Sequence, residues 1–333
     1  MLVLGLSACG SGTPGTQSKP TTPTTPTAPT TPANTWSAAG RVTSLATSQG
    51  VGGATVTPGW SLAPVNADGD GNYQLGDVQN PPSTPYPVTV SAAGYVSHDV
   101  WITWARGPRT GVDIDLIRDA APFSMDFYRQ FVRDTFDNDS GAPFPVLRWT
   151  SAPSFYVHID QTGKPIEPTE VLPVTLDAIQ RAVPLFTGGL YQAAAIEVGT
   201  DVRPATPGWI NVDIQRVDVR TATSIICGQA YVGANPGTIT LYYDACPCTG
   251  NKVPGDITVH EVGHALGFFH VSDKNSVMYP QIQGNCPRPG NLSPAEQFHA
   301  KIAYSRPRGN TEPDHNPSNA GTLKNVNPLI LVQ

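Results

Sequence analysis

The fold of the last third of the chain is decided by residues 260–270, which read His260-Glu261-Val262-Gly263-His264-Ala265-Leu266-Gly267-Phe268-Phe269-His270. Residues four apart lie on one face of a helix, so His260 and His264 can bind one cation together. Glu261 lies roughly 100° further round the helix, within reach of a water on that cation. His270 cannot share that helix face, and Gly267 can adopt the left-handed conformation that turns the chain back. The stretch therefore predicts a helix, a turn and a metal site with three histidines.

The residue types of this predicted site indicate catalytic zinc. Zn²⁺ binds imidazole nitrogens at about 2.0–2.1 Å, and a catalytic site keeps one position open for water. We interpret the three histidines as ligands of one Zn²⁺ and Glu261 as the general base that activates the metal-bound water. One alternative is an amphipathic helix with surface histidines. Another is a structural zinc site, but such sites usually have four protein ligands, often cysteines.

A second motif begins six residues after His270, in Ser276-Val277-Met278-Tyr279-Pro280. Together with residues 260–270 it resembles the metzincin zinc peptidases, and it is most similar to their matrixin branch. The resemblance implies hydrolysis of peptide bonds, a single catalytic zinc ion, and a turn at Met278 that forms a hydrophobic base beneath the metal. It leaves the calcium requirement open. Tyr279 is not assigned as a ligand, because the branches that use a tyrosine place it one residue later.

The patterns around the histidines indicate an α/β zinc protease domain over residues 119–305, with a mixed twisted sheet and helices. Helical spacing is present at 123–136 and 175–186, and strand-like runs at 154–159, 193–198, 209–214 and 238–243. Ser293-Pro294-Ala295-Glu296 is a capping box with proline at the first helical position, which predicts a helix to about Tyr304.

Residues 237–243 have two interpretations. By resemblance to the matrixins, they would form the sheet-edge strand over the cleft, to which an extended substrate could add as a further strand. The alternative is an ordinary core strand. The sequence favours neither.

Residues 36–118 predict a separate small all-β sandwich, because short alternating runs are punctuated by Gly, Pro, Asn and Asp. Three stretches resemble a carboxypeptidase-regulatory-like domain: Gly52-Gly53-Ala54-Thr55-Val56, Ala67-Asp68-Gly69-Asp70-Gly71-Asn72-Tyr73 and Val88-Thr89-Val90-Ser91-Ala92-Ala93-Gly94-Tyr95. We interpret this module as an accessory one, for spacing or binding. It contains a single histidine, His98, and the zinc ligands of carboxypeptidases follow a different pattern.

Both ends of the chain differ in character from the modules between them. Residues 1–9 resemble a bacterial lipoprotein signal that lacks its basic start, and the resemblance implies lipidation at Cys9. Residues 10–35 are rich in Thr and Pro and predict an extended linker. Residues 306–333 form a C-terminal tail, for which the sequence indicates no function.

The other four cysteines are Cys227, Cys246, Cys248 and Cys286, and in an exported chain they predict two disulfides. A bridge between Cys246 and Cys248 would be strained, because one residue separates them. Cys227 and Cys286 should therefore each take one of that pair, in an order that the sequence leaves open. A zinc site at Cys246-Pro247-Cys248 is the alternative, but its spacing is one residue short of the usual CxxC.

The composition excludes several other classes of protein. The net charge of −6 without a basic cluster argues against nucleic acid as a partner, and the sequence has no apolar run long enough to span a membrane. We expect a monomer that acts on protein or peptide substrates and contacts the membrane only through Cys9, outside the cell or at a bacterial surface. The alternative function is a surface binding protein that keeps the protease-like zinc domain as a scaffold. The presence of Glu261 favours the enzyme.

Overall fold

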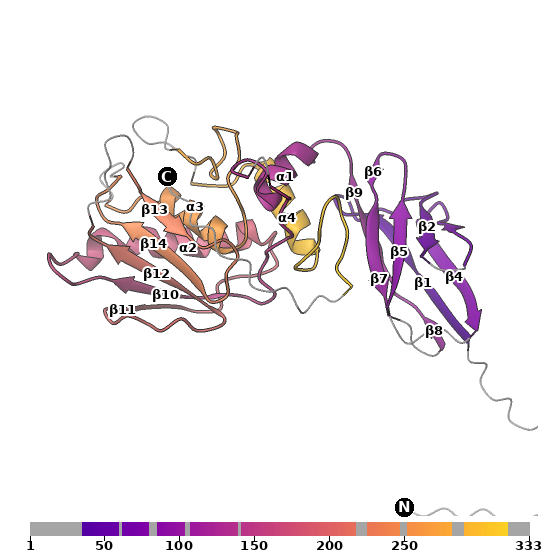
Figure 1. The fold of residues 1–333 in the computed structure, drawn as a ribbon, viewed down its shortest axis with the longest axis horizontal. Helices are drawn as coiled ribbons and strands as arrows, with labels where there is room; N and C mark the ends of the chain where they lie inside the picture. Colours follow the sequence, from indigo (N-terminus) through magenta and orange to yellow (C-terminus); the bar gives the residue numbers. More distant parts are fainter. Residues whose placement is uncertain are drawn as a thin grey trace, which may run out of the picture.

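The computed structural model describes residues 35–59, 62–79, 85–103, 107–138, 141–217, 225–246, 252–281 and 290–318. These residues form an all-β unit, followed by a unit that combines a mixed sheet with helices (Figure 1). Within them, none of the helices has the length and apolar character needed to cross a bilayer. The predicted lipobox with Cys9, most of the linker and residues 319–333 lie outside the described residues.

The all-β unit consists of two sheets that enclose one apolar core. One sheet has the order β4-β1-β9-β6, with β8 paired to β1, and the other has the order β3-β2-β5-β7. Strands such as β5 alternate, with Val88 and Val90 buried on either side of the exposed Thr89, so one face of each sheet turns to the core. Their bounds are β1 Thr35–Ser44, β2 Thr55–Pro58, β3 Val65–Asn66, β4 Asn72–Gln79, β5 Tyr86–Ser91, β6 Tyr95–Val96, β7 His98–Ile102, β8 Gly107–Arg109 and β9 Ile114–Arg118.

The sheet of the second unit has the order β11-β10-β12-β14-β13. Its bounds are β10 Ser154–Ile159, β11 Ile196–Gly199, β12 Trp209–Gln215, β13 Gly228–Ala230 and β14 Gly237–Tyr242. The first four strands in this order run parallel, and β13 pairs antiparallel with β14. Strand β14 has a neighbour on each side, so of the two interpretations of residues 237–243 the core strand is correct. The edge on the β14 side of the sheet is formed by β13, which at three residues is too short to show a pattern in the sequence.

The helices are α1 Met125–Arg133, α2 Leu172–Phe186, α3 Gly255–Ala265 and α4 Pro294–Ser305, with a short 3₁₀ turn at Pro168–Glu170. Helix α3 lies on β13 and β14 and packs against α2, while α4 contacts α1 and α2. The predicted helix at 123–136 is shorter than expected. It begins after Ser124, whose side chain caps the first turn, and ends before Asp134, which adopts a left-handed conformation with φ 61°.

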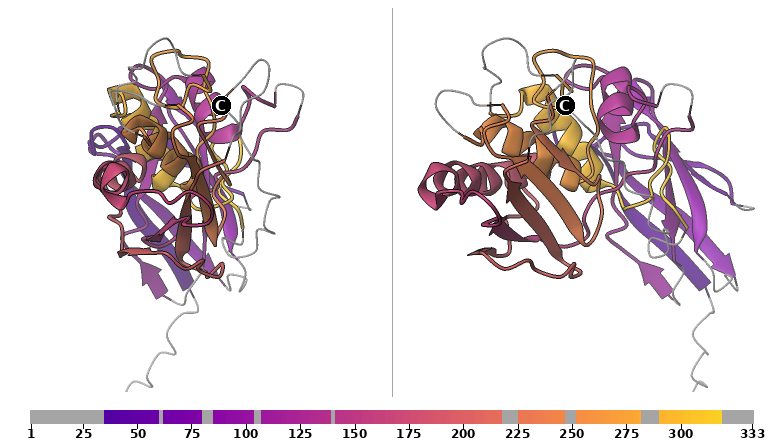
Figure 2. Two further views of the ribbon diagram at one scale, coloured as in Figure 1. Left: turned by 90° about the vertical axis from the view of Figure 1, so that its left-hand side faces the viewer. Right: turned by 60° about the vertical axis from the view of Figure 1, so that its left-hand side comes forward.

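The first part of the predicted tail lies between the two units, beside α4 and β7 (Figures 1 and 2). The side chain of Arg306 is 1% exposed and forms ion pairs with Asp115 of β9 and with Asp314. The backbone of residues 309–316 forms hydrogen bonds with β7 on one side and with Val146 on the other. This part of the tail therefore joins the sandwich to the α/β unit.

Candidate metal centre

The structure brings the three histidines of residues 260–270 together in the interior. His260 and His264 project from α3, and His270 comes from the segment that follows the end of this helix. The Nε2 atom of His264 lies 3.0 Å from Nε2 of His260 and 3.2 Å from Nε2 of His270. All three residues are buried, with exposed fractions of 2% or less. Among the described residues they are the one cluster of His, Cys, Asp or Glu with metal-ligand spacing.

The opposite ring nitrogens show that this cluster fits a cation. Each Nδ1 atom lies beside an oxygen acceptor: the Val277 carbonyl at 2.6 Å for His260, the Phe268 carbonyl at 2.8 Å for His264, and Asp137 Oδ2 at 2.7 Å for His270. An oxygen acceptor needs a donor, so each Nδ1 carries a proton, and in this tautomer a metal-binding ring presents its lone pair at Nε2. Three lone pairs that converge repel one another unless a cation lies between them. Nitrogens bound to one tetrahedral zinc ion lie roughly 3.3 Å apart, close to the separations seen here.

Gly267 adopts the backbone conformation that the sequence predicts for the turn. Its φ is +106°, which side chains rarely tolerate. A Cβ atom at this position would also lie 2.9 Å from the carbonyl group of Leu147. The glycine thus ends α3 and lets the chain pass close to Leu147 before it returns with His270.

Glu261 lies against the edge strand of the sheet. Its exposed fraction is 1%, and a Cβ atom added to Gly228 at the start of β13 would lie 2.7 Å from Glu261 Oε1. The pKa of the nearby Tyr242 is raised, first by burial and then by the charge of Glu261. The carboxylate predicted as the general base therefore lies where β13 passes α3. The sequence gives no sign of the role of Gly228.

Met278 is fully buried beneath α3. A Cβ atom at Gly263 would lie 2.7 Å from Met278 Sδ, so the absence of a side chain at Gly263 lets the methionine approach the helix between the first two histidines. The carbonyl of Val277, which precedes Met278, is the acceptor for His260. The turn at Met278 thus supports the site both by packing and by orienting one ring.

Glu296 connects this turn to α4. The sequence predicts it only as part of the capping box, which the structure confirms. Its Oε2 accepts a hydrogen bond from Ser293 N at 2.6 Å, while its Oε1 accepts bonds from Ser276 Oγ at 2.5 Å and Val277 N at 3.0 Å. Glu296 is 1% exposed. It therefore holds the N-terminus of α4 and the turn at Met278 in a fixed relation.

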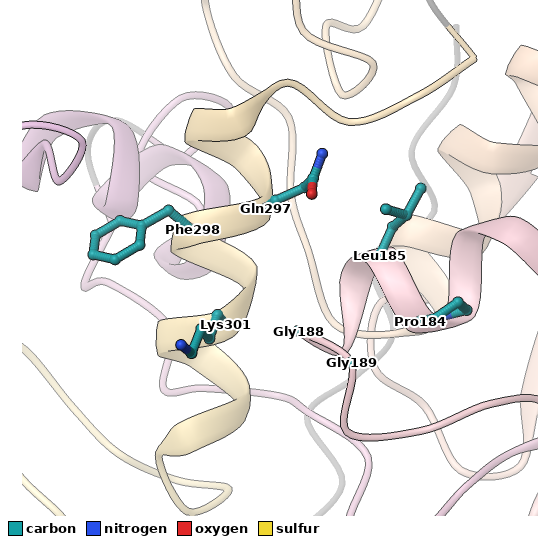
Figure 3. Close-up of a pocket in the computed structure, with 7 residues that line it drawn as sticks. All are labelled: Pro184, Leu185, Gly188, Gly189, Gln297, Phe298 and Lys301. Carbon is teal, nitrogen blue, oxygen red and sulfur yellow. The ribbon is translucent and has the colours of Figure 1, made fainter. Parts of the chain in front are cut away.

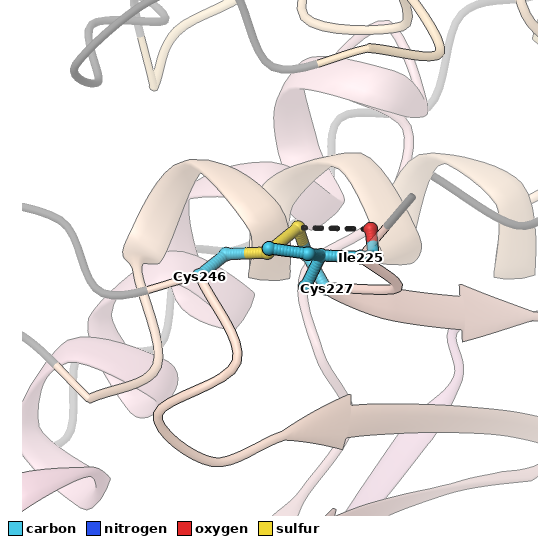
Figure 4. Close-up of a disulfide and its surroundings, with 3 residues drawn as sticks. All are labelled: Ile225, Cys227 and Cys246. Atoms are coloured by element: carbon cyan, nitrogen blue, oxygen red, sulfur yellow. Dashed lines mark hydrogen bonds between the residues drawn. A yellow bond between two sulfur atoms is a disulfide. The ribbon is translucent and has the colours of Figure 1, made fainter. Parts of the chain in front are cut away.

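Cys227 and Cys246 form a disulfide that joins the start of β13 to the turn after β14 (Figure 4). This is one of the two pairings that the sequence allows for Cys227. Cys248 and Cys286 lie outside the described residues, as does most of the proposed Cys246-Pro247-Cys248 zinc site. The disulfide fixes the edge strand next to Glu261.

Two acidic residues at the end of α1 also belong to the surroundings of the site. Asp137 contacts His270, and Asp134 is 2% exposed. Burial, and then the charge of Asp137, raise the pKa of Asp134 to about 7. Neither residue is part of a recognisable sequence motif, and both are more than 110 residues from the start of α3.

A pocket lies between the C-terminal end of α2 and α4, lined by residues that include Leu185, Phe298 and Lys301 (Figure 3). Its lining contains none of the predicted site residues. Lys301 is its one charged group, so the pocket offers no acid–base pair and no metal ligands.

Comparisons with known proteins agree with this geometry. A family profile described as Matrixin matches residues 254–296, which include the three histidines, Met278 and Glu296. The chain is 31% identical over 84 residues to proteins named extracellular metalloprotease from Arthroderma benhamiae and from Trichophyton verrucosum. The matched part is 22% of this chain and 26% of each relative, so the chain spans about a quarter of the length of these relatives. The geometry and these matches together support a zinc metallopeptidase.

Two solved structures that match this chain carry no argument for this assignment. Two mutants of a type II cohesin–X-dockerin complex from Acetivibrio cellulolyticus match with a TM-score of 0.19 and 13% identity. The matches cover 24% and 25% of this chain, and 56% and 57% of the matched chains. A similarity at this level does not indicate a common fold.

Proposed function

We propose that the protein is a zinc-dependent endopeptidase in which His260, His264 and His270 bind the metal and Glu261 is the general base. The observation that carries this proposal is the convergence of three Nε2 atoms whose Nδ1 atoms all face oxygen acceptors. The buried carboxylate of Glu261 follows the first of these histidines in α3, where an open catalytic site needs a base.

The reaction needs a water molecule with a lowered pKa and a polarised substrate carbonyl. Zinc bound at the histidines would supply both effects. Glu261 would accept a proton from the attacking water and return it to the departing amine. Little solvent surrounds the buried carboxylate of Glu261. Its electrostatic interactions with the reacting groups are therefore less screened than they would be in water. Each ring would donate its Nδ1 proton to its acceptor and leave Nε2 free to bind the metal.

The substrate is proposed to bind as an extended peptide along β13. Among the described strands, β13 pairs with β14 alone, so its other edge is open to a further strand. Gly228 lies in this strand and approaches Glu261. A peptide paired with β13 would therefore have its backbone carbonyls beside the catalytic carboxylate. This arrangement favours cleavage within a chain over removal of terminal residues.

We also propose that the protein acts outside the cell as a monomer, attached through lipidated Cys9. The disulfide Cys227–Cys246 is typical of an oxidising compartment, and the matched relatives are named extracellular. The sandwich would then be a rigid spacer or binding module, because Arg306 and its neighbours join it to the α/β unit.

The test uses the full chain, loaded with zinc and incubated with a quenched peptide library. We expect one zinc per chain, cleavage at internal peptide bonds, loss of cleavage after treatment with a chelator, and recovery when zinc is restored. Zinc bound at one per chain without cleavage of any peptide would support the binding-protein alternative instead. Cleavage that persists in the metal-free protein would contradict the proposal.

A further inference from the structure

His270 differs from the other two histidines in the group that orients its ring. His260 and His264 donate to backbone carbonyls from the turn at Met278 and from the end of their own helix. His270 instead has a carboxylate beside its Nδ1, at 2.7 Å from Asp137 Oδ2. Asp137 is 133 positions away in the sequence and belongs to a different element.

The turn at the end of α1 holds Asp137 in this place. Asp134 ends the helix with φ 61°, and its carbonyl accepts a hydrogen bond from Asn138 N at 3.2 Å. The turn follows directly after α1, and its Asp137 carboxylate reaches the ring of His270. The backbone positions on either side of Asp137 are thus joined by a hydrogen bond.

Helix α1 also holds the segment that carries His270. Phe269 N donates to the Phe131 carbonyl at 2.9 Å, and Ser272 N donates to Gln130 Oε1 at 2.8 Å. These two bonds fix the backbone one residue before and two residues after His270. Since α3 has already ended, α1 replaces it as the support of the third histidine.

The contact between His270 and Asp137 joins a buried ring to a partly exposed carboxylate. The side chain of His270 is 3% exposed and that of Asp137 is 32% exposed. The imidazole is thus shielded from water, while the carboxylate reaches the surface. A carboxylate that accepts the Nδ1 proton fixes the tautomer, makes Nε2 more basic and adds negative charge next to a cation.

We propose that Asp137 is a positioning residue of the metal centre, which orients His270 and raises the affinity of the three histidines for Zn²⁺. The inference rests on the proposed zinc site but not on the identity of the substrate. Loss of such a partner typically lowers metal affinity 10- to 100-fold. Asp137 would act on the metal only through His270, which it contacts.

The test measures the zinc affinity of the full chain by competition with a chromophoric chelator, and the thermal unfolding of the metal-free protein. We expect Asp137→Ala to lose roughly 10- to 100-fold in zinc affinity, and Asp137→Asn, which keeps an oxygen acceptor without the charge, to lose less. Asp137→Glu should recover part of the loss. Asp177→Asn on α2 is the matched control, because it removes an acidic charge paired with Arg181 on an exposed helix face. Its zinc affinity should equal that of the wild type.

The outcomes separate this inference from the proposed function. A wild-type protein that binds no zinc overturns the metal site and this inference with it. A wild-type protein that binds one zinc, with Asp137→Ala within twofold of it, overturns the role of Asp137 alone. Equal losses in the Ala, Asn and Glu variants, together with a lower Tm of the metal-free protein, would show that Asp137 supports only the fold of the turn.

Discussion

The close approach of Gly228 to Glu261 predicts a variant that loses catalysis but keeps its fold and its metal. In Gly228→Ala the new Cβ atom would lie 2.7 Å from Glu261 Oε1, 2.9 Å from Cγ and 3.0 Å from Cδ, whereas ordinary contacts begin at 3.4 Å. The carboxylate must therefore move by roughly 0.7 Å. The end of a glutamate side chain can move this far, so the free energy of unfolding should fall by less than about 1 kcal/mol.

The displacement should be large enough to disturb proton transfer. General acid–base catalysis contributes about 10²- to 10⁴-fold to rate, and a misplacement of about 1 Å can cost about 10²-fold. We therefore expect kcat to fall roughly 10- to 100-fold in Gly228→Ala, with little change in KM and none in zinc content.

The assay is steady-state cleavage of a quenched peptide, with zinc measured in the same samples. Gly76→Ala in β4 is the control, because a Cβ atom there meets no atom within 4 Å. If Gly228→Ala keeps kcat within twofold of the wild type, Glu261 does not act from the position seen here.

Three further predictions concern stability. In Asp134, the folded-state pKa of about 7 exceeds the ordinary value of 3.8, so the unfolded state loses its proton first and stability falls as the pH rises between these values. Asp134→Asn should therefore gain about 2–3 kcal/mol relative to the wild type on going from pH 5 to pH 8, measured by urea unfolding of the metal-free protein. An equal difference at both pH values would refute this. In Glu296→Ala the free energy of unfolding should fall by about 2–4 kcal/mol and the zinc affinity should also fall, because the turn at Met278 loses its buried acceptor. An unchanged urea midpoint and an unchanged zinc affinity would contradict this. In Arg306→Met the free energy of unfolding should fall by about 3–5 kcal/mol, because Asp314 stays buried without its cation. An unchanged Tm would contradict the role of this ion pair.

The parts of the site that are close together in sequence could be predicted from it. The spacing of His260, His264 and His270 follows from helix geometry, and Gly267 marks the turn between them. Likewise, Ser293 and Glu296 form a capping box of four residues, which predicts the start of α4. In each case the interacting groups are separated by at most ten positions.

The supporting residues could not be predicted, because their contacts form only in the folded chain. Asp137 lies in a loop with no periodicity and meets His270 through the packing of α1. The edge strand β13 has three residues, and Gly228 matters there only because α3 passes beside it. Arg306 follows the last predicted helix and lies in a polar segment, so the sequence does not indicate that it is buried. Its burial is possible because two carboxylates pair with it.

The central claim is that the three histidines and Glu261 form a hydrolytic centre, and one measurement tests it most directly. The rate of peptide cleavage is compared between the wild type and Glu261→Gln, with both proteins confirmed to carry one zinc per chain. The substitution keeps the size of the side chain and removes its ability to accept a proton. We expect zinc binding to be retained and kcat to fall by at least about 10²-fold. Cleavage by Glu261→Gln at the wild-type rate would contradict the assignment of this centre as the catalytic site.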